Sequence, residues 1–524
     1  MPRLLIDAQP VDVPPGTTLL EAARQAGLAI PTLCHLAEKP NRQAGCGICV
    51  VEDLDTGRLL PACVTRADEV ARIATGSPRV HEARRQTLAL LLGDHRADCE
   101  APCQLACPSR LDIPRLMRAL AAGDFRRAAG IVDDALALPH LLAAFCAAPC
   151  EKRCHRRDLD APLAIQAAVG LAVTYGAAGA PPPPAPPGGR RVTLVGAGPA
   201  GLATAGFLLR RGHVCHLVER APRAGGALWS VPGFPATALE RDLDTLRRLG
   251  ATFAFNTRLE EGHDTLDSFA KTCDALVICC GEEEAPACAR ALGLPLTHNH
   301  LAPLMVRQVN GRPFPVFAAG AATHPVRMAV IANAQGRLTA EKVDAWLREG
   351  AAAGEPPPVH AFRSHAGSLP TAALTSMANP LCRDATRQAL TDTASPETLV
   401  REALRCLQCA CAKADDCRLR AVCAAEELPS THGRHAERLA GRIDTGHGVA
   451  IEPAKCIACG ICVRRSQVLQ APLGIAFHGR GYDVRIGPPA GHTWQELPAD
   501  LLRDAAAHCP TGAITIEVPE SSVP

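Results

Sequence analysis

The sequence predicts a multidomain protein that combines α+β domains with one α/β domain. Its 524 residues suffice for three or four domains. A Pro-rich stretch over 177–189 predicts a stiff linker that divides the chain. Beyond this linker, a strand–turn–helix–strand pattern is typical of a parallel α/β sheet. Most of the 25 cysteines gather in short-spaced groups outside that region.

The segment 191–219 carries the clearest motif. A short apolar run, VTLV, predicts a buried strand and leads into a turn that contains Gly196, Gly198 and Gly201. The first glycine permits the tight turn, the second lets the main chain approach a pyrophosphate, and the third lets helix and strand pack closely. Glu219 ends a second apolar run, where a carboxylate can accept hydrogen bonds from a ribose. The segment therefore predicts a dinucleotide site; the alternative is a glycine-rich turn without a ligand.

Composition and charge narrow the function. The formal net charge of +2 gives no indication of nucleic acid or an anionic membrane as a partner. No stretch approaches the roughly 20 apolar residues of a membrane-spanning helix, and the N-terminal MPRLLIDAQPVDVPPG lacks the apolar core of a signal peptide. A cytoplasmic protein is therefore expected. Because that compartment keeps thiols reduced, the grouped cysteines point to metal centres rather than disulfides.

Residues 1–80 form the first predicted domain. A strand-like LLID and a helix-like TTLLEAARQAG precede four cysteines with the pattern C-x11-C-x2-C-x13-C: Cys34, Cys46, Cys49 and Cys63. The long first interval resembles the N-terminal ferredoxin-like domain of the large peripheral subunit of respiratory complex I and of iron hydrogenases. The resemblance implies a β-grasp fold with one [2Fe–2S] cluster. A zinc site is the alternative, although a single CxxC with two distant partners fits a two-CxxC zinc ribbon less well.

Residues 81–176 are predicted to form a helical domain, because QTLALLLGD and PRLMRALAAGDFRRAAGIVDDAL have helical periodicity. Two cysteine triplets interrupt it, each with the spacing C-x3-C-x3-C: Cys99, Cys103 and Cys107, then Cys146, Cys150 and Cys154. The segment from CEAPCQLACPSR to FCAAPCEKRC resembles the N-terminal double-[4Fe–4S] domain of the glutamate synthase small subunit, which also occurs in dihydropyrimidine dehydrogenase.

Six cysteines cannot supply the eight ligands of two [4Fe–4S] clusters. The resemblance implies one cluster on Cys99, Cys103 and Cys154, and a second on Cys107, Cys146 and Cys150. His95 stands where the family usually has its first cysteine, and imidazole can replace thiolate on iron. The alternative for His95 is a surface histidine before a loop. Gln166 is a weakly supported candidate for the last ligand of the second cluster.

The region 190–350 contains further signs of a nucleotide domain. CDALVICCG and FPVFAAG read as strands that end in glycine, and the sequence after the second one predicts a long helix. With the opening motif these segments resemble FAD-binding flavoproteins of the glutamate synthase small-subunit and disulfide-reductase kind. The resemblance implies that Gly226 and Gly320 also bind FAD. Ala321 replaces the aspartate that contacts the ribityl chain in that group.

One part of that family pattern is missing. In the family, a second glycine-rich domain for NADPH lies between the segments that match Gly281 and Phe314. Only about thirty residues join them here, without a GxGxxG motif and too short for a βαβ unit with flanking strands. The NADPH domain is therefore expected to be absent. The cysteines scattered through this region are expected to be small buried hydrophobes: Cys215, Cys273, Cys279, Cys280 and Cys288.

The C-terminal part is rich in cysteine again. Residues 351–398 are expected to be a connecting segment around the flavin domain, with no role for Cys382, and 399–524 a ferredoxin-like domain. Within it, C-x2-C-x2-C and a later Cys-Pro resemble half of a bacterial ferredoxin with one [4Fe–4S] cluster, with Ser466 at the usual fourth position: Cys456, Cys459, Cys462 and Cys509. A preceding group could hold a further [4Fe–4S] cluster, which is favoured, or a zinc ion: Cys406, Cys409, Cys411 and Cys417, with Cys423 nearby.

These parts together predict an FAD-dependent iron–sulfur oxidoreductase subunit with FAD, one [2Fe–2S] cluster and three to four [4Fe–4S] clusters. Flavin converts two-electron chemistry into the single-electron steps that clusters accept. The expected partner is a catalytic subunit such as a formate dehydrogenase or hydrogenase, because the first domain resembles that of complex I and hydrogenases and the NADPH domain is missing; no catalytic residues of a substrate site are evident. One alternative is an NAD(P)H-dependent oxidoreductase of the glutamate synthase small-subunit type. The other is a cluster-only wire or scaffold with a vestigial flavin site.

Overall fold

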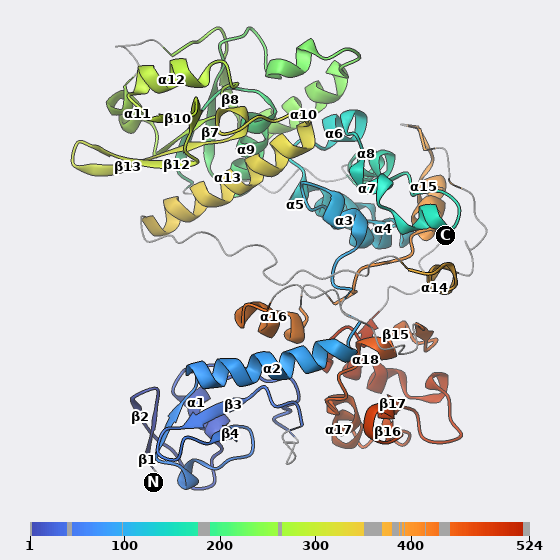
Figure 1. The fold of residues 1–524 in the computed structure, drawn as a ribbon. Coiled ribbons are helices and arrows are strands. Elements are labelled where there is room, and N and C mark those ends of the chain that lie inside the picture. The colour runs from blue at the N-terminus through green and yellow to red at the C-terminus, as the bar shows by residue number, and fades with distance from the viewer. Residues whose placement is uncertain are drawn as a thin grey trace. The chain divides into compact units, whose positions relative to one another are not determined.

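The computed structural model describes residues 3–38, 45–96, 98–176, 189–259, 265–350, 369–379, 387, 390–391, 393–413, 416–428 and 441–516. Nearly all of the predicted linker, most of the predicted connecting segment 351–398, and Cys382 lie outside these residues. The chain divides into two compact units, which are described separately (Figure 1). Unit 1 takes the described residues of Met1–Ala101, His360–Ala378 and Leu407–Ser522. Unit 2 takes those of Pro102–Val359 and Asn379–Cys406.

The N-terminal part of unit 1 is a five-stranded mixed sheet covered by one helix. The strand order is β2-β1-β5-β3-β4, in which β1 and β5 are parallel and the other neighbours antiparallel. The bounds are β1 (Arg3–Ile6), β2 (Gln9–Asp12), α1 (Leu19–Gln25), β3 (Val50–Asp53), β4 (Leu59–Pro61) and β5 (Arg72–Ala74). Thr18 and Glu21 form a capping box that begins α1, and the apolar face of α1 is buried against the sheet.

A long helix, α2 (Pro78–Asp94), leaves this sheet and ends just before His95. The C-terminal half of unit 1 contains α14 (Thr371–Met377), α16 (Arg418–Ala425), α17 (Ile461–Val468) and α18 (Ala499–His508). Its strands are β14 (Ile443–Asp444), β15 (Val449–Ile451) and β18 (Ile514–Ile516) in one antiparallel sheet, and β16 (Ala476–His478) and β17 (Arg485–Gly487) in a hairpin. Glu426, at the end of α16, accepts hydrogen bonds from His81 (2.7 Å) and Arg84 (3.4 Å) on α2. These bonds fasten α16 to α2.

Unit 2 contains a helical part and a nucleotide-fold part. The helices are α3 (Pro102–Ala106), α4 (Ile113–Ala121), α5 (Phe125–Ala135), α6 (Pro139–Phe145), α7 (Pro149–Lys152), α8 (Ile165–Gly176) and α15 (Pro396–Leu404). The sheet has the order β12-β13-β9-β6-β7-β8, with all neighbours parallel except β12, an antiparallel edge strand. Its strands are β6 (Arg191–Val195), β7 (Val214–Val218), β8 (Thr252–Ala254), β9 (Ala275–Ile278), β12 (Leu304–Val309) and β13 (Arg312–Ala318).

Helices pack on this sheet: α9 (Pro199–Arg210), α10 (Ala236–Arg248), α11 (Leu266–Thr272), α12 (Ala285–Leu292) and α13 (Ala329–Glu349). In Figure 1, α13 is the long helix that runs beside the sheet. It approaches α9 so closely that a Cβ on Gly336 would lie 2.7 Å from the Cβ of Ala203. The five scattered cysteines of this part are buried as expected, with exposed fractions of 8% or less.

The two parts of unit 2 share one core. Leu138 and Leu141 of the helical part pack in the same apolar cluster as the residues of β6 and α9. Two buried polar side chains reinforce this junction. Asn333 on α13 accepts from the backbone N–H of Ala137 at 2.9 Å, and Asp242 on α10 accepts from the backbone N–H groups that begin α6. The helical part and the nucleotide fold therefore form a single packed body.

Asp242 makes a pH dependence of this junction predictable. Burial raises the pKa of Asp242 to about 7, although the N–H groups of Leu141 and His140 oppose the rise. The folded state then holds a proton that the unfolded chain, with a pKa near 4, has released. The contribution of Asp242 to the stability of unit 2 is therefore present below about pH 4 and decreases as the pH rises to about 7. In Asp242→Asn this fall in the free energy of unfolding should vanish in urea titrations between about pH 4 and 7. An unchanged slope would contradict the assignment.

Candidate functional site

The turn after β6 has the geometry that a dinucleotide needs. Gly196 has a φ of +105°, and a Cβ there would lie 2.7 Å from the carbonyl oxygen of Cys279. A Cβ on Gly201 would clash with the carbonyl oxygen of Gly196. A Cβ on Gly198, at the start of α9, would meet no protein atom within 4 Å. The first and third glycines are thus required by the fold itself, whereas the second leaves open space at the helix N-terminus, where an anion can bind.

The other predicted nucleotide residues lie near this turn. Glu219 follows β7; it is buried, and its carboxylate accepts the backbone N–H of Ala197 at 2.7 Å. A Cβ on Gly226 would lie 3.2 Å from the Cα of Gly198. Gly320 follows β13 with a φ of +69°, and a Cβ there would lie 2.6 Å from the Cβ of Ala200. The structure therefore brings the predicted nucleotide residues to the carboxyl edge of the parallel strands, where ligands of such sheets bind.

The short segment between Gly281 and Phe314 is described throughout. It folds into α12, a hairpin of β10 (Leu296–Thr297) and β11 (His300–Leu301), and the edge strand β12. These elements complete the existing sheet and build no second parallel βαβ unit within the described residues. A separate domain of the NADPH-binding kind is accordingly not found in the part of the chain that the structure covers.

The four cysteines of the N-terminal domain lie in two pairs. The thiol of Cys46 interacts with that of Cys34, and the thiol of Cys49 with that of Cys63. The interaction with Cys34 is the main cause that lowers the pKa of Cys46 to about 6, against the effect of burial. All four are buried. Such pairing suits two irons with two thiolate ligands each.

Cysteines of the helical part converge in unit 2. Helix α3 packs on α7, and Cys107 and Cys146 lie close enough to Cys150 to raise its pKa, after the larger effect of burial. Cys154 is buried at the start of the next turn. The predicted grouping of Cys107 with Cys146 and Cys150 thus corresponds to a group of neighbours. Cys99 lies in unit 1 and Cys103 in unit 2, so their predicted sharing of a cluster stays a prediction.

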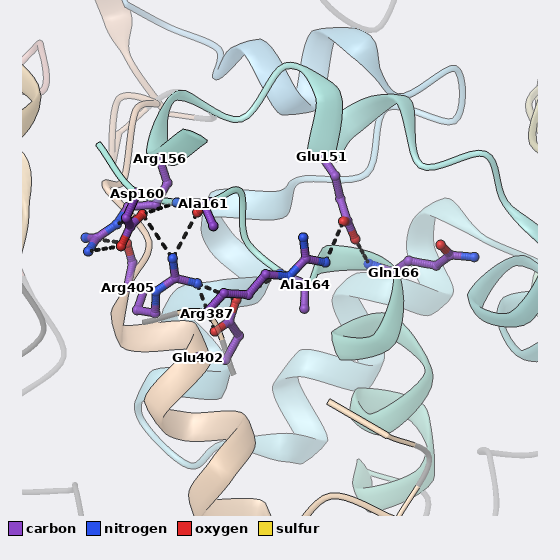
Figure 2. A network of polar contacts seen from close by, with 9 residues as sticks. All are labelled: Glu151, Arg156, Asp160, Ala161, Ala164, Gln166, Arg387, Glu402 and Arg405. Atoms are coloured by element: carbon purple, nitrogen blue, oxygen red, sulfur yellow. Dashed lines mark hydrogen bonds and ion pairs between the residues drawn. The ribbon is translucent and has the colours of Figure 1, made fainter. Parts of the chain in front are cut away.

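A polar network fixes the loop after Cys154 (Figure 2). Arg405 donates to Glu402 at 2.8 Å and to Asp160 at 3.1 Å, and its side chain is fully buried. Arg156 donates twice to the same Asp160, at 2.9 and 2.8 Å, and once to the carbonyl oxygen of Arg405 at 3.3 Å. Cys406 follows Arg405 directly, so this network holds it at the end of α15 beside the Cys154 loop.

The same figure shows where Gln166 lies. Its backbone N–H donates to Glu151 at 3.0 Å, while its side chain extends away from Glu151. Glu151 also pairs with Arg387 at 2.9 Å. The structure gives Gln166 a backbone role at the start of α8, and its side chain as an iron ligand stays a prediction.

The C-terminal cysteines also lie together. Cys456, Cys459 and Cys509 are near enough to Cys462 that each raises its pKa, after the effect of burial. Ser466 has another use, since its hydroxyl donates to the carbonyl oxygen of Cys462 and accepts from the backbone N–H of Ile475 at 2.9 Å. It therefore helps to hold the loop 462–475 rather than pointing to the cysteines.

Within the described ranges, no three His, Cys, Asp or Glu side chains converge closely enough to hold one metal ion. The choice between iron–sulfur clusters and zinc at the cysteine groups stays a prediction.

Sequence reasoning missed the basic residues between these sites. Arg464 on α17 donates to the carbonyl oxygens of both Cys34 and Cys459, the latter at 3.5 Å. Lys455 is buried with 1% exposure and pairs with Glu452 at 2.7 Å and Asp98 at 3.4 Å. The sequence does place a basic residue next to or near the cysteines, in KCIAC and in CVRR, and this pattern could have indicated them. Arg464 directly links the predicted [2Fe–2S] loop to the predicted C-terminal [4Fe–4S] loop.

Four protein families match segments of the chain. Residues 3–78 match a 2Fe-2S iron–sulfur cluster binding domain, and 66–174 match domain II of dihydropyrimidine dehydrogenase, a 4Fe-4S cluster domain. Residues 194–237 match an NAD(P)-binding Rossmann-like domain, and 449–516 a 4Fe-4S single cluster domain. With the sheets and helices described above, these matches confirm the predicted fold class. They define a protein with iron–sulfur cluster domains and a dinucleotide-type fold.

Curated relatives agree with the predicted resemblance. The chain is 33% identical over 34% of its length to the NADP(+)-dependent formate dehydrogenase subunit beta of Moorella thermoacetica, covering 29% of that protein. It is 41% identical over 19% of its length to the NADP-reducing hydrogenase subunit HndD of Solidesulfovibrio fructosivorans, covering 18%. It is 30% identical over 36% of its length to the glutamate synthase [NADPH] small chain of Bacillus subtilis, covering 41%. The chain thus spans less than half of each relative.

Among the described helices, none is alone long and apolar enough to cross a bilayer; the bent pair of α5 and α6, at 86° to each other, passes on length and composition only.

Proposed function

We propose that the chain is the electron-transfer subunit of a larger oxidoreductase, with FAD at the 191–320 site and electrons passing between it and iron–sulfur clusters. The observation that carries this proposal is the single core of unit 2. The nucleotide turn and the cysteines of the helical part belong to one packed body, so a cofactor and clusters bound there would keep a fixed separation. Bound FAD would exchange two electrons with a donor and single electrons with the clusters.

The residues at the turn fit FAD. Gly196 and Gly201 shape the turn, Gly198 leaves space for the pyrophosphate, and Glu219 offers a buried carboxylate to a ribose. Gly226 and Gly320 border the same space. Glu219 accepts backbone N–H groups of Ala197 and Ala221. Its carboxylate is therefore held in a fixed orientation.

The partner is proposed from the relatives. The matched proteins from Moorella and Solidesulfovibrio are subunits of a formate dehydrogenase and a hydrogenase. A catalytic subunit of that kind would exchange electrons with the clusters of this chain. The two subunits would then lie in the same cellular compartment. Co-purification of the native complex and identification of its subunits tests this part.

Gly198→Ala provides the sharpest test of the nucleotide site. Alanine fits the fold there, because φ is −74° and a Cβ has open space, yet it would obstruct a bound pyrophosphate. We expect a loss of at least tenfold in flavin content of the purified chain with an unchanged unfolding midpoint. Gly130→Ala, an open position on α5, is the control and should retain flavin. Retention of stoichiometric flavin by Gly198→Ala would overturn the proposed pyrophosphate site.

A second candidate is an NAD(P)H-dependent oxidoreductase in which nicotinamide meets the flavin directly. It is favoured by the NAD(P)-binding description of the family matched over 194–237. It predicts steady-state diaphorase activity of the purified chain with an artificial acceptor, whereas the first proposal predicts none above the background of free flavin. A protein that contains clusters but no flavin after denaturation would instead support a cluster-only wire.

A further inference from the structure

Unit 1 is discontinuous in sequence. Its chain leaves after Ala101, returns over His360–Ala378, and returns again from Leu407. The points of departure and return are adjacent, because the backbone N–H of Cys411 donates to the carbonyl oxygen of Asp98 at 2.9 Å. Two cysteine groups that lie about 300 residues apart in sequence therefore meet inside one unit.

Three buried thiols lie at this meeting point. Cys99 and Cys417 pack in one buried cluster between α2 and α16, and each is 8% exposed. Cys411 is equally buried, and its sulfur lies so close to Gly512 that a Cβ there would clash with it. The thiol of Cys417 donates to the carbonyl oxygen of Pro510 at 3.6 Å, two residues before Gly512, and the backbone of Cys411 is hydrogen-bonded to that of Asp98, next to Cys99. The three thiols are thus neighbours.

The surroundings suit an anionic metal centre. The backbone N–H of Arg420 donates to the sulfur of Cys417 at 3.5 Å. The Arg420 guanidinium lies 3.4 Å from Glu100, and the buried Lys455 lies 3.4 Å from Asp98. Hydrogen bonds and positive charge beside thiolates stabilise an iron–sulfur cluster in the protein interior and tune its potential.

His95 lies at the entrance to the same loop. It caps the C-terminus of α2 and is 5% exposed, with both ring nitrogens buried. Arg96 and Asp98 are each held by a backbone hydrogen bond: the N–H of Arg96 donates to the carbonyl oxygen of Ala454 at 2.8 Å, and the carbonyl oxygen of Asp98 accepts from the N–H of Cys411 at 2.9 Å. Three residues separate His95 from Cys99. Imidazole can serve as a ligand of cluster iron.

We propose that Cys99, Cys411 and Cys417, with His95, hold one [4Fe–4S] cluster that lies entirely within unit 1. In this ligand set Cys99 no longer shares a cluster with Cys103 and Cys154. Its members come from the parts of the sequence before and after unit 2. It leaves Cys406, which belongs to unit 2, available to the cysteines of the helical part. The assignment concerns the metal site alone and does not depend on the flavin or on the partner.

The test compares which cluster is lost in single variants of the full-length chain, purified anaerobically. Cys99→Ala, Cys411→Ala and Cys417→Ala should each lose about four irons and sulfides per chain, and all three should lose the same EPR signal. Cys103→Ala should lose a different signal. The [2Fe–2S] signal, from the same unit as the proposed centre, reports correct folding in every variant. Cys423→Ala is the matched control, because Cys423 is fully buried on α16 beside Cys417 but is not in the ligand set.

Two results would overturn the proposal. One is that Cys99→Ala and Cys103→Ala lose the same signal while Cys411→Ala retains it. The other is that Cys411→Ala or Cys417→Ala loses one zinc ion instead of four irons. His95 is tested separately: His95→Cys should keep the iron but lose the nitrogen couplings in pulsed EPR spectra of this cluster. If those couplings are absent from the wild-type protein, His95 is not a ligand.

Discussion

Arg405→Ala is expected to destabilise unit 2 by about 3 to 5 kcal/mol, because it removes one partner of a buried ion network. Arg405 and Glu402 are fully buried, and Arg405 also reaches Asp160. Alanine would leave the Glu402 carboxylate buried without the guanidinium. The measurement is the urea midpoint of unfolding, followed by far-UV circular dichroism. Arg401→Ala, an exposed position on the same helix, should change stability by less than about 0.5 kcal/mol.

The pH dependence of this effect can also be derived. Burial would raise the pKa of Asp160, but hydrogen bonds from Arg156, the N–H of Ala161 and Arg405 lower it to about 2. A carboxyl whose pKa is lowered in the folded state stabilises that state above its unfolded pKa of about 4, and the effect is lost as the pH falls towards 2. The difference between wild type and Arg405→Ala should therefore narrow on acidification. A difference that widens below pH 5 would contradict this account. Because Cys406 follows Arg405, the variant should also lose iron from unit 2.

Glu426→Ala is expected to destabilise unit 1 by about 3 kcal/mol. Glu426 faces Arg84, which is 4% exposed and also donates to the carbonyl oxygens of Ile48, Val50 and Thr75. Without Glu426 this buried guanidinium keeps its hydrogen bonds but loses its counter-charge, and α2 is no longer tied to α16. The measurement is the denaturant midpoint followed by the visible circular dichroism of the [2Fe–2S] cluster.

Two further variants make this second prediction specific. Glu426→Gln keeps a hydrogen-bond acceptor and should cost less than alanine. Glu427→Ala, at the exposed neighbouring position, should leave the midpoint unchanged. Since α2 leads to His95 and α16 follows Cys417, Glu426→Ala should also lower the occupancy of the proposed cluster. Full occupancy with an unchanged midpoint would show that the link does not position the ligands.

Local patterns predicted the elements well and their boundaries less well. The strand–turn–helix pattern of 191–219 needed only neighbouring residues, because the φ angle of Gly196 and the close contact of Gly201 are set within the turn. The periodic segment PRLMRALAAGDFRRAAGIVDDAL became two helices. Gly123, with a φ of +68°, ends α4, and Asp124 caps α5 by accepting the N–H of Arg127. The glycine and aspartate are ordinary signals for the end of one helix and the start of the next, but the continuous helical periodicity outweighed them in the prediction.

Contacts between distant cysteines could not be predicted from spacing. Cysteine motifs report which ligands are near in sequence, but Cys99 and Cys411 become neighbours only through the packing of unit 1. Distant pairs of the same kind join Lys455 to Asp98, Arg420 to Glu100, and Glu426 to Arg84. Their charges in the sequence resemble ordinary surface residues. These charged side chains stabilise the fold because they are buried, and their local sequence does not show that they are buried.

The interrupted path of the chain through unit 1 has a consequence for its synthesis. Translation proceeds at about 5 to 20 residues per second, so roughly 300 residues delay Cys411 by about 15 to 60 s after Cys99 leaves the ribosome. During that interval Cys99 lacks the two cysteines with which we propose that it shares a cluster, so its thiol can be oxidised or can bind the wrong metal. Insertion of the proposed cluster on Cys99, Cys411 and Cys417 must therefore wait until Cys417 has been synthesised, whereas all four cysteines of the predicted [2Fe–2S] site are present much earlier.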